Sequence, residues 1–366
     1  MNVTRGHRVD ALIRACHDAA SELALFEAVS DQLRELVPFD GAAWFATDPA
    51  TLLGTSAVRV ENVERGHCET YWERECLFED ALLFRDVARS SEGVATLYDV
   101  TGNRPADSAR YREYLAPQGY GDQLRAAFRL GNTTWGVLDL YRDRLRAPFS
   151  KRERDQIQQI TPVVARALRA FAAEKHEPVA AGGPGTALFN GRGNLLSLDV
   201  QAERLFEEIG GPGWKTFPAS MTPVHAVTAR ATAVLRGRDD GPAATRLRSA
   251  SGRWLVLHAS RLRGPDGSPG PTAVTVEPAR SEQIAPLMMA AYALTPREQQ
   301  VTRAVARGLS SQEIAAELFL SPHTVRDHLK AIFLKAGVTS RGELVATLFA
   351  DHYKDPLHES ADQVEW

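Results

Sequence analysis

The feature that most constrains how this chain can fold is a run of four short amphipathic segments between residues 294 and 349. Three of them begin with a serine or threonine followed three residues later by a glutamate, a spacing that lets the two side chains cap the first turn of a helix. The pairs are Thr295 with Glu298, Ser310 with Glu313, and Ser340 with Glu343. Gly308 and Gly337 are placed to end helices. Capped helices joined by such short turns predict a small all-α, four-helix domain.

The third segment, from Ser321 to about residue 336, has two chemically different faces. Its apolar side chains recur at the spacing of one buried helical stripe: Val325, Leu329, Ile332 and Phe333. Its polar side chains lie opposite, with a lysine near the end: His323, Arg326, Asp327, Lys330 and Lys335. A cationic helix face held by a short turn suits contacts with phosphates and base edges. A bundle whose charges are only solvated is the alternative that this pattern leaves open.

The segment as a whole resembles the DNA-binding domain of LuxR-type (LuxR/FixJ/NarL) transcription regulators. The resemblance rests on L-T-P-R-E at 294–298, G-L-S-x-x-E-I-A at 308–315, L-x-L-S-P-H-T-V-R-D-H-L-K at 318–330 and K-A-G-V-x-S-R-x-E-L at 335–344. It implies that the third helix lies in the major groove, as in other helix-turn-helix proteins.

By position, the resemblance implies that Arg326, Asp327 and Lys330 face the bases, and that Ser321, Thr324 and Lys335 lie near the phosphates. Arg326 and Lys330 are suited to donate to guanine, and Asp327 to accept from cytosine. Asp327 would also repel phosphate, so pairing with a neighbouring cation is a second interpretation. The fourth helix either forms a dimer contact, as in relatives, or only packs on the bundle.

The distribution of charge along the chain predicts that any DNA contact lies in this domain. The chain of 366 residues carries a net charge of −3, so it is not a polycation as a whole. Between Thr295 and Glu343, however, seven basic and five acidic residues give a net charge of +2. The length and the ordinary share of hydrophobic residues predict two to three domains.

Residues 1–175 predict an α+β domain. We expect a helix over 10–37, strands at 42–47, 56–60 and near 95–98, a helix near 61–76, a hairpin of 123–130 with 133–141, and a helix from a capping box at Ser150 to about Lys175. With D-G-A-A-W-F at 40–45 and W-G-V-L-D-L-Y at 135–141 ahead of F-S-x-x-E-R-D, the segment resembles a GAF domain, a class of sensor module that can hold haem, bilin or cyclic nucleotide. Five aromatic residues are either pocket or core: Trp44, Tyr71, Trp72, Phe84 and Trp135.

The remaining segments complete the predicted domain order. Residues 176–185 read as a linker by composition. Residues 186–280 predict a smaller α+β unit of two strands, helices and a three-strand meander. This unit resembles a PAS domain, on L-F-N-G-R-G-N-L-L-S-L-D-V-Q-A-E-R-L-F at 188–206. Residues 281–293 predict a connecting helix into the helix-turn-helix domain at 294–350, and 351–366 an acidic tail.

The sequence lacks the residues that several other functions require. No lysine precedes Lys151, so the N-terminal domain lacks the cation that a phosphorylated receiver domain needs. Trp214 stands where a P-loop at 210–216 needs glycine. Cys16, Cys68 and Cys76 form no disulfide framework, and His67 with the last two makes a weak metal motif. There is neither a long apolar segment nor a signal-peptide core, which predicts a cytoplasmic protein without membrane contact.

Together these patterns predict a non-enzymatic transcription regulator that binds double-stranded DNA as a homodimer. A small-molecule effector or a protein partner would act on the sensor domains. The sequence identifies neither a ligand-binding residue nor a metal site nor a cofactor. Two alternatives remain: a signalling protein that acts through protein partners, and a GAF-linked enzyme whose helical tail does not bind DNA.

Overall fold

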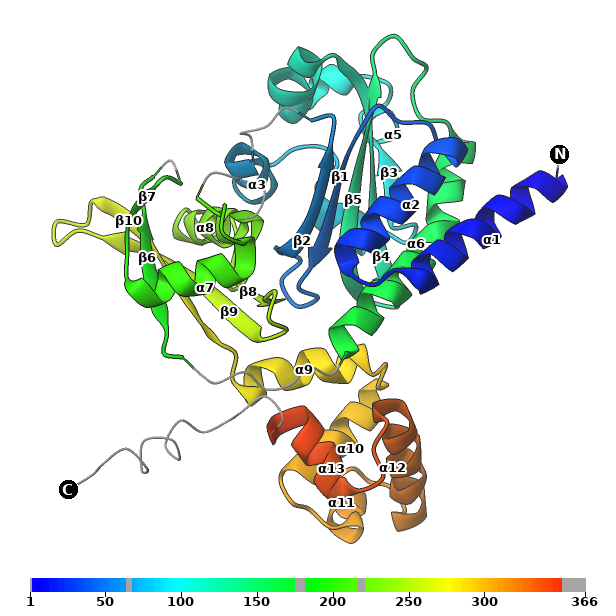
Figure 1. Ribbon diagram of the computed structural model, residues 1–366, viewed down its shortest axis with the longest axis vertical. Helices are drawn as coiled ribbons and strands as arrows, with labels where there is room; N and C mark the ends of the chain where they lie inside the picture. The colour runs from blue at the N-terminus through cyan, green and yellow to red at the C-terminus, as the bar shows by residue number, and fades with distance from the viewer. Residues whose placement is uncertain (1, 64–67, 175–181, 192, 216–220, 351–366) are drawn as a thin grey trace. The chain divides into compact units, whose positions relative to one another are not determined.

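The computed structural model describes residues 2–63, 68–174, 182–191, 193–215 and 221–350. The chain forms two compact units. The first holds most of the chain up to Glu277, and the second begins at Pro278 and takes in short stretches near 172–182 and 252–254. The predicted α+β class is confirmed at this level, because two antiparallel sheets precede a helical C-terminal region (Figure 1). None of the described helices is long and apolar enough to cross a membrane.

The first sheet has five strands in the order β2-β1-β5-β4-β3. They are β1 Gly41–Thr47, β2 Gly54–Glu61, β3 Val94–Thr96, β4 Tyr120–Leu130 and β5 Thr133–Asp143. The predicted hairpin is confirmed as β4 and β5, which pair antiparallel across Gly131 at φ +60°. Helices α1 Asn2–Asp18, α2 Glu22–Leu36 and α6 Lys151–Ala173 lie beside this sheet, and α3 Cys68–Leu77 lies on its other side (Figure 1).

Strand β1 is buried along its whole length because both faces of the sheet are covered. Neighbouring residues of a strand point to opposite faces. Trp44 packs against Phe26 of α2, with ring centroids 5.9 Å apart, and Phe45 packs against Tyr71 of α3 at 5.4 Å. The five aromatics that the sequence left open all lie in the core, each at most 7% exposed: Trp44, Tyr71, Trp72, Phe84 and Trp135.

A network of buried charges lies between this sheet and α3. Arg125 on β4 forms ion pairs with Asp139 on β5 (2.9 Å) and with Glu75 on α3 (2.5 Å). Arg110 pairs with Glu75 at 2.6 Å, and the Tyr71 hydroxyl donates to Asp139 at 3.0 Å. Two guanidinium groups and two carboxylates therefore balance one another where no water reaches them.

The second sheet repeats the strand order of the first, as β7-β6-β10-β9-β8. Its strands are β6 Gly185–Phe189, β7 Leu195–Leu198, β8 Ala244–Arg248, β9 Trp254–Arg263 and β10 Pro269–Pro278. Helices α7 Val200–Gly210 and α8 Thr222–Leu235 fall between β7 and β8. The predicted sequence of two strands, helices and three strands is therefore present. Trp214 packs on Phe206 (5.3 Å between centroids), which makes it a core residue of this part.

The two sheets belong to one compact unit with a shared hydrophobic core. Helices α3 and α8 pack together, and β2 lies near β8. Asp48, only 1% exposed, accepts from the backbone N–H of Arg246 at 2.8 Å and binds its guanidinium at 2.5 and 2.8 Å. Arg230 donates to the carbonyl of Thr51 at 3.0 Å. These contacts join residues that are almost two hundred positions apart in the sequence.

Three sequence expectations need correction. The helix expected over 10–37 is two helices, because Ser21 adopts an extended backbone and its side chain caps α2 by accepting from the Ala24 N–H. The strand expected at 95–98 stops at Thr96, whose hydroxyl caps the short helix α5 Leu97–Val100. The helix expected near 61–76 begins later, since β2 continues to Glu61 and α3 starts at Cys68. In each case a local hydrogen bond or strand pairing decided where the element ends.

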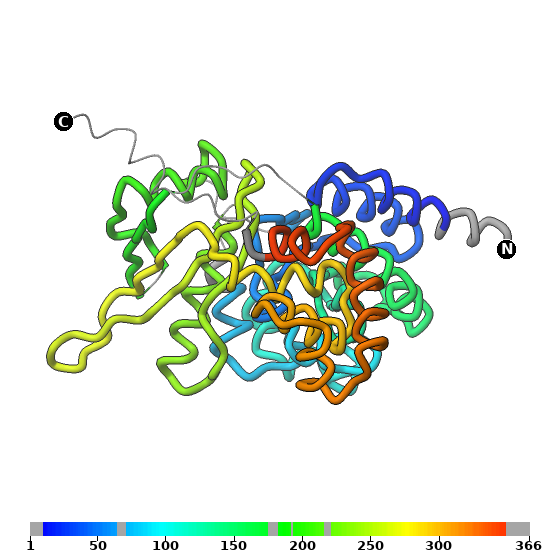
Figure 2. The backbone as a smooth tube through the Cα atoms, turned by 90° about the horizontal axis from the view of Figure 1, so that it is seen from below, coloured from blue at the N-terminus to red at the C-terminus, as the bar shows by residue number. Residues whose placement is uncertain are grey.

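The second unit consists of short helices that cross one another. They are α9 Ser281–Ala291, α10 Pro296–Ala306, α11 Ser311–Glu317, α12 Pro322–Ala336 and α13 Arg341–Val345, followed by a π-helical turn at Ala346–Ala350. Figure 2 shows α12 and α13 at a large angle to each other. The capping boxes at Thr295 and Ser310 are confirmed. At the third, Ser340 accepts from the Glu343 N–H, but the Glu343 side chain binds Thr339 instead of the cap residue. The acidic tail predicted at 351–366 lies outside the described residues.

Candidate nucleic-acid interface

Helix α12 begins at a side-chain cap. Ser321 Oγ accepts from the backbone N–H of Thr324 at 3.0 Å and lies 2.8 Å from its hydroxyl, and Pro322 occupies the first helical position. The helix ends at Gly337, which takes the left-handed conformation at φ +64°. The two hydroxyls expected near the phosphates therefore both lie at the N-terminus of α12, where helix amides and dipole favour anions.

The inner face of α12 anchors it to the other helices. Val325, Leu329 and Ile332 are each at most 6% exposed, as their spacing predicted, and Phe333 is half-buried. Two arginines fix the connecting turns through backbone carbonyls. Arg297 donates to Leu318 at 2.5 Å, and Arg341 donates to Leu309 at 2.9 Å. Because a carbonyl acceptor leaves the guanidinium charge in place, these bonds position the helices without neutralising the domain.

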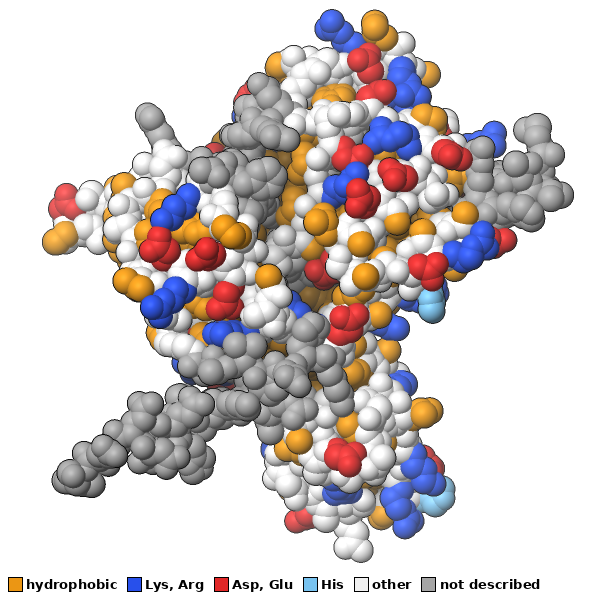
Figure 3. Space-filling model, in the orientation of Figure 1, with side chains coloured by type: hydrophobic (Ala, Val, Ile, Leu, Met, Phe, Trp, Pro, Cys, Tyr) orange, Lys and Arg blue, Asp and Glu red, His pale blue; other side chains and the backbone are white. Residues whose placement is uncertain are grey.

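The outer face of α12 carries two exposed cations. Arg326 and Lys330 lie one helical turn apart, and neither forms an ion pair with any residue that the structure describes. Like charges at this spacing destabilise a helix by about 0.2–0.5 kcal/mol, so the proximity of these two cations costs the helix stability. Asp327 lies 3.0 Å from Nδ1 of His323, a neighbour on the same helix. Blue and pale-blue side chains gather over α12 in Figure 3.

Lys335 differs from the other cations because it already has an acidic partner. Its ammonium donates to both carboxylate oxygens of Glu298 (2.7 and 2.9 Å) and to the carbonyl of Ala293 (3.2 Å). Partial burial opposes the charge of Glu298, but the bonds from Lys335 and Thr295 outweigh it and hold the pKa of Glu298 below its ordinary value. The sequence showed Glu298 only as a capping residue, and nothing in the local pattern indicated that it would also bind a lysine 37 positions away.

The turn before α12 contains a strained and fully exposed aromatic residue. Phe319 adopts φ +54°, a left-handed conformation that is unfavourable for a residue with a side chain. The residue is 95% exposed. The turn before α12 therefore uses this backbone angle, while the Phe319 side chain lies almost wholly in solvent.

A short capped helix, a tight turn and a second helix with an exposed cationic face define a helix-turn-helix domain, here packed with two further short helices. The family comparison agrees with this class. Residues 292–348 match the profile of the bacterial regulatory proteins of the luxR family. The C-terminal region is therefore a LuxR-family helix-turn-helix domain, as the sequence motifs implied.

The curated relatives share this domain. An HTH-type transcriptional regulator of Mycobacterium bovis is 50% identical over 52 residues, which cover 14% of this chain and 6% of that protein. The transcriptional regulatory protein UhpA of Escherichia coli is 46% identical over 56 residues, which cover 15% of this chain and 29% of UhpA. This chain thus spans only a small part of these relatives.

Solved structures show distant likenesses to this chain. Escherichia coli SdiA aligns over 96% of this chain with 13% identity and a TM-score of 0.31. The chromophore-binding domain of the bacteriophytochrome RpBphP3 from R. palustris aligns over 45% of this chain with 14% identity and a TM-score of 0.30.

Proposed function

We propose that this protein is a transcription regulator that binds duplex DNA with helix α12. The observation that carries the proposal is that Arg326 and Lys330 are exposed on α12 of a LuxR-family domain and form no ion pair with any of the residues that the structure describes. Their spacing brings both cations to the same side of the helix, where a groove would meet them. The forked guanidinium of Arg326 and the ammonium group of Lys330 are donors that fit guanine O6 and N7 in the major groove.

The other four residues predicted to contact DNA differ in what surrounds them in the structure. Ser321 and Thr324 lie at the helix N-terminus, a favourable place for a phosphate oxygen. Asp327 would read cytosine only after its contact with His323 is exchanged for one with the base. Lys335 would have to leave Glu298, or bind phosphate while it still contacts that carboxylate. We therefore infer that Arg326 and Lys330 supply most of the specific contacts.

We also propose that the first unit is a sensor that controls this reader as part of a homodimer. Two sheets with the same strand order, one in a GAF-like and one in a PAS-like sequence, support tandem sensor modules. The lack of a lysine before Lys151 favours control by a small effector or a protein partner over phosphorylation of a receiver domain. An effector shifts such a regulator only if it binds the two states with different affinity.

Selection from randomised duplexes tests DNA binding without knowledge of the operator. The purified full chain would be used to enrich a pool of random duplexes, and the affinity for the selected sequence would be measured by fluorescence anisotropy. We expect Arg326→Ala and Lys330→Ala each to cost about 1–3 kcal/mol of specific binding. Arg263→Ala, which removes an exposed cation from β9, is the control and should bind like the parent.

The outcome separates this function from its alternatives. Enrichment of a sequence that both α12 variants lose supports the proposal. If no duplex is enriched even at low salt, where phosphate contacts are strongest, the protein acts through protein partners or as an enzyme and the domain does not read DNA. If a duplex is enriched and both variants bind it like the parent, a different surface makes the contact.

A further inference from the structure

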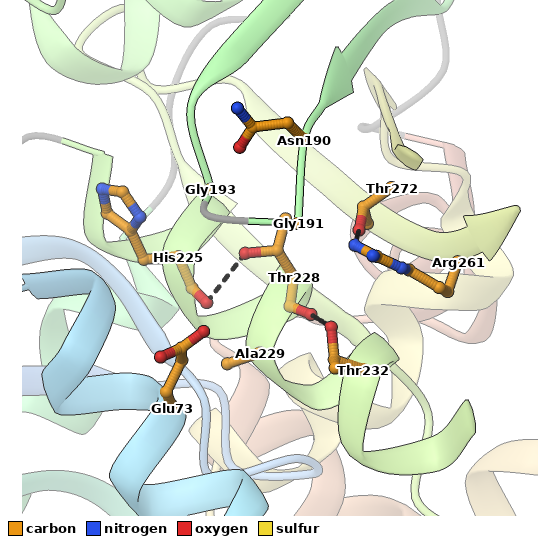
Figure 4. Close-up of a pocket in the computed structure, with 10 residues that line it drawn as sticks. All are labelled: Glu73, Asn190, Gly191, Gly193, His225, Thr228, Ala229, Thr232, Arg261 and Thr272. Atoms are coloured by element: carbon orange, nitrogen blue, oxygen red, sulfur yellow. Dashed lines mark hydrogen bonds between the residues drawn. The ribbon is translucent and has the colours of Figure 1, made fainter. Parts of the chain in front are cut away.

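A cavity between helices α3 and α8 is too small to hold an effector (Figure 4). Its volume is about 20 Å³, which leaves room for about one water molecule. The hydroxyls of Thr228 and Thr232, which line it, donate to backbone carbonyls of α8. The outer face of α12, by contrast, carries an exposed side chain that neither the fold nor the contacts proposed above use: Leu334.

Leu334 is directed away from the core of the helix-turn-helix domain. It is 86% exposed, and it lies about half a helical turn from Ile332, which is fully buried. A single exposed leucine is ordinary on a protein surface. What makes this one informative is the set of residues that shares its side of the helix.

Arg326, Lys330 and Leu334 form one row along the outer face of α12. They follow one another at intervals of four residues, and all three are exposed. On an α-helix this interval moves each side chain about 6 Å along the axis and only about 40° around it. Asp327, seven residues before Leu334, lies beside the same row. Two cations are therefore followed by an apolar group on the side of the helix that is proposed to enter the groove.

The surroundings of Leu334 suit DNA better than a protein partner. Its neighbours on the exposed face are Lys330 and Asp327, whereas the centres of protein interfaces are depleted in charged residues. One leucine also covers far less than the roughly 800 Å² that each partner of a stable protein complex buries. In the major groove, by contrast, polar and apolar contacts lie side by side, because thymine presents a methyl group next to the hydrogen-bonding edges of the bases.

The spacing of the row matches successive base pairs. In zinc-finger helices, which also read the major groove, side chains three to four residues apart contact neighbouring bases. If Arg326 and Lys330 bind two base pairs, Leu334 meets the next one along the groove. The apolar partner that this groove offers to a leucine is the methyl group of thymine.

We propose that Leu334 is a specificity-determining residue that packs against a thymine methyl group, in the base pair beyond the one bound by Lys330. The inference deepens the DNA-binding function proposed above and rests on it. Arginine and lysine select guanine through hydrogen bonds, and Leu334 adds a preference that no hydrogen bond supplies. The operator should therefore hold a thymine close to the guanines that the two cations bind.

Replacing thymidine by deoxyuridine removes this methyl group and keeps the base pair. In the duplex selected by the full chain, each thymine would be replaced singly, and the affinity measured by fluorescence anisotropy. At one thymine we expect the affinity of the parent to fall about fourfold, the scale for one methyl group. Leu334→Ala should bind the duplexes with and without that methyl group equally well, because the side chain that contacts it is gone.

Further variants separate base reading from other effects. Leu334→Ala should bind the selected duplex about three- to tenfold more weakly than the parent, and it folds because alanine is the best helix former. Its affinity for a duplex of unrelated sequence should stay that of the parent, since non-specific binding depends on phosphate contacts. Leu334→Met keeps an apolar side chain and should keep the sensitivity to the methyl group. Leu145→Ala, which removes a leucine that is 90% exposed in the first unit, is the matched control and should bind like the parent.

The outcomes distinguish this inference from the function on which it rests. If deoxyuridine weakens the parent and Leu334→Ala alike, or weakens neither, Leu334 does not read a methyl group. An equal loss on selected and unrelated duplexes would assign Leu334 to the DNA backbone and would also contradict the proposal. A selected duplex that is lost by Arg326→Ala but bound normally by Leu334→Ala refutes this inference alone. If no duplex is enriched, the DNA-binding function and this inference both fail.

Discussion

At the scale of single residues, Phe319 is a position where the turn depends on the backbone angle while the side chain lies in solvent. The turn before α12 needs φ +54° at this position, yet the ring is 95% exposed. Asparagine tolerates the left-handed conformation better than other residues with side chains. We expect Phe319→Asn to raise the free energy of unfolding by about 0.5–1 kcal/mol, measured by urea denaturation of the full chain. Phe319→Val, which is stiffer there, should lower it; a loss of stability with asparagine would show that the ring has a packing role.

Glu298 links the stability of the helix-turn-helix domain to pH. Partial burial disfavours its charge, but the bonds from Lys335 and Thr295 outweigh that cost and lower its pKa from 4.5 in the folded state. A carboxyl group with a lowered folded pKa stabilises the protein above its unfolded pKa and loses that contribution as the pH falls. We expect Glu298→Gln to lower the melting temperature most at neutral pH and progressively less below pH 4.5. A difference that is constant with pH would mean that the carboxylate charge is not involved.

At the scale of elements, strands β4 and β5 place a buried ion pair across the first sheet. Arg125 and Asp139 are directly opposite each other in the register, and both side chains are fully buried. Removing one charge leaves the other buried without its full complement of partners. We expect Asp139→Asn to cost about 3–5 kcal/mol of unfolding free energy in urea denaturation.

An exposed ion pair provides the control for that substitution. Lys151 and Asp155 lie 3.5 Å apart on the surface of α6. Asp155→Asn makes the same chemical change in water and should cost less than about 0.5 kcal/mol. If the two substitutions had equal effects, burial would not be what makes the Arg125 network important for folding.

The elements show why sequence alone succeeded at some places and failed at others. Helix ends marked by Thr295 and Ser310 were predicted correctly because a capping box is a local pattern of four residues. The break at Ser21 was missed because the apolar spacing continues through it, and only a hydrogen bond to Ala24 shows the new start. The partner of Lys335 was missed because it lies on another helix. Local signals define elements, whereas contacts between elements require the fold.

At the scale of the whole molecule, the first unit repeats one architecture. If the strands of each sheet are numbered in the order in which they occur along the chain, both sheets place them side by side as second, first, fifth, fourth and third. The sequence predicted strands in both segments but gave no information on how the segments join. The reason is that the join depends on Asp48 and Arg246, 198 positions apart, and on packing of α3 against α8. Neither residue belongs to a recognisable motif.

The Asp48 contact should make the two sheet regions unfold together. Asp48 is buried and receives three bonds from Arg246, one from the backbone and two from the guanidinium. Arg246→Ala removes the two side-chain bonds and leaves a buried carboxylate with only part of its partners, a change that typically costs about 3–5 kcal/mol. We expect the variant to melt earlier in differential scanning calorimetry, with a broader transition for the first unit because the coupling between its sheets is weakened. Arg263→Ala, an exposed arginine on the second sheet, should leave the transition unchanged. If Arg246→Ala melts with the parent's midpoint and width, the hydrophobic core alone couples the two sheet regions.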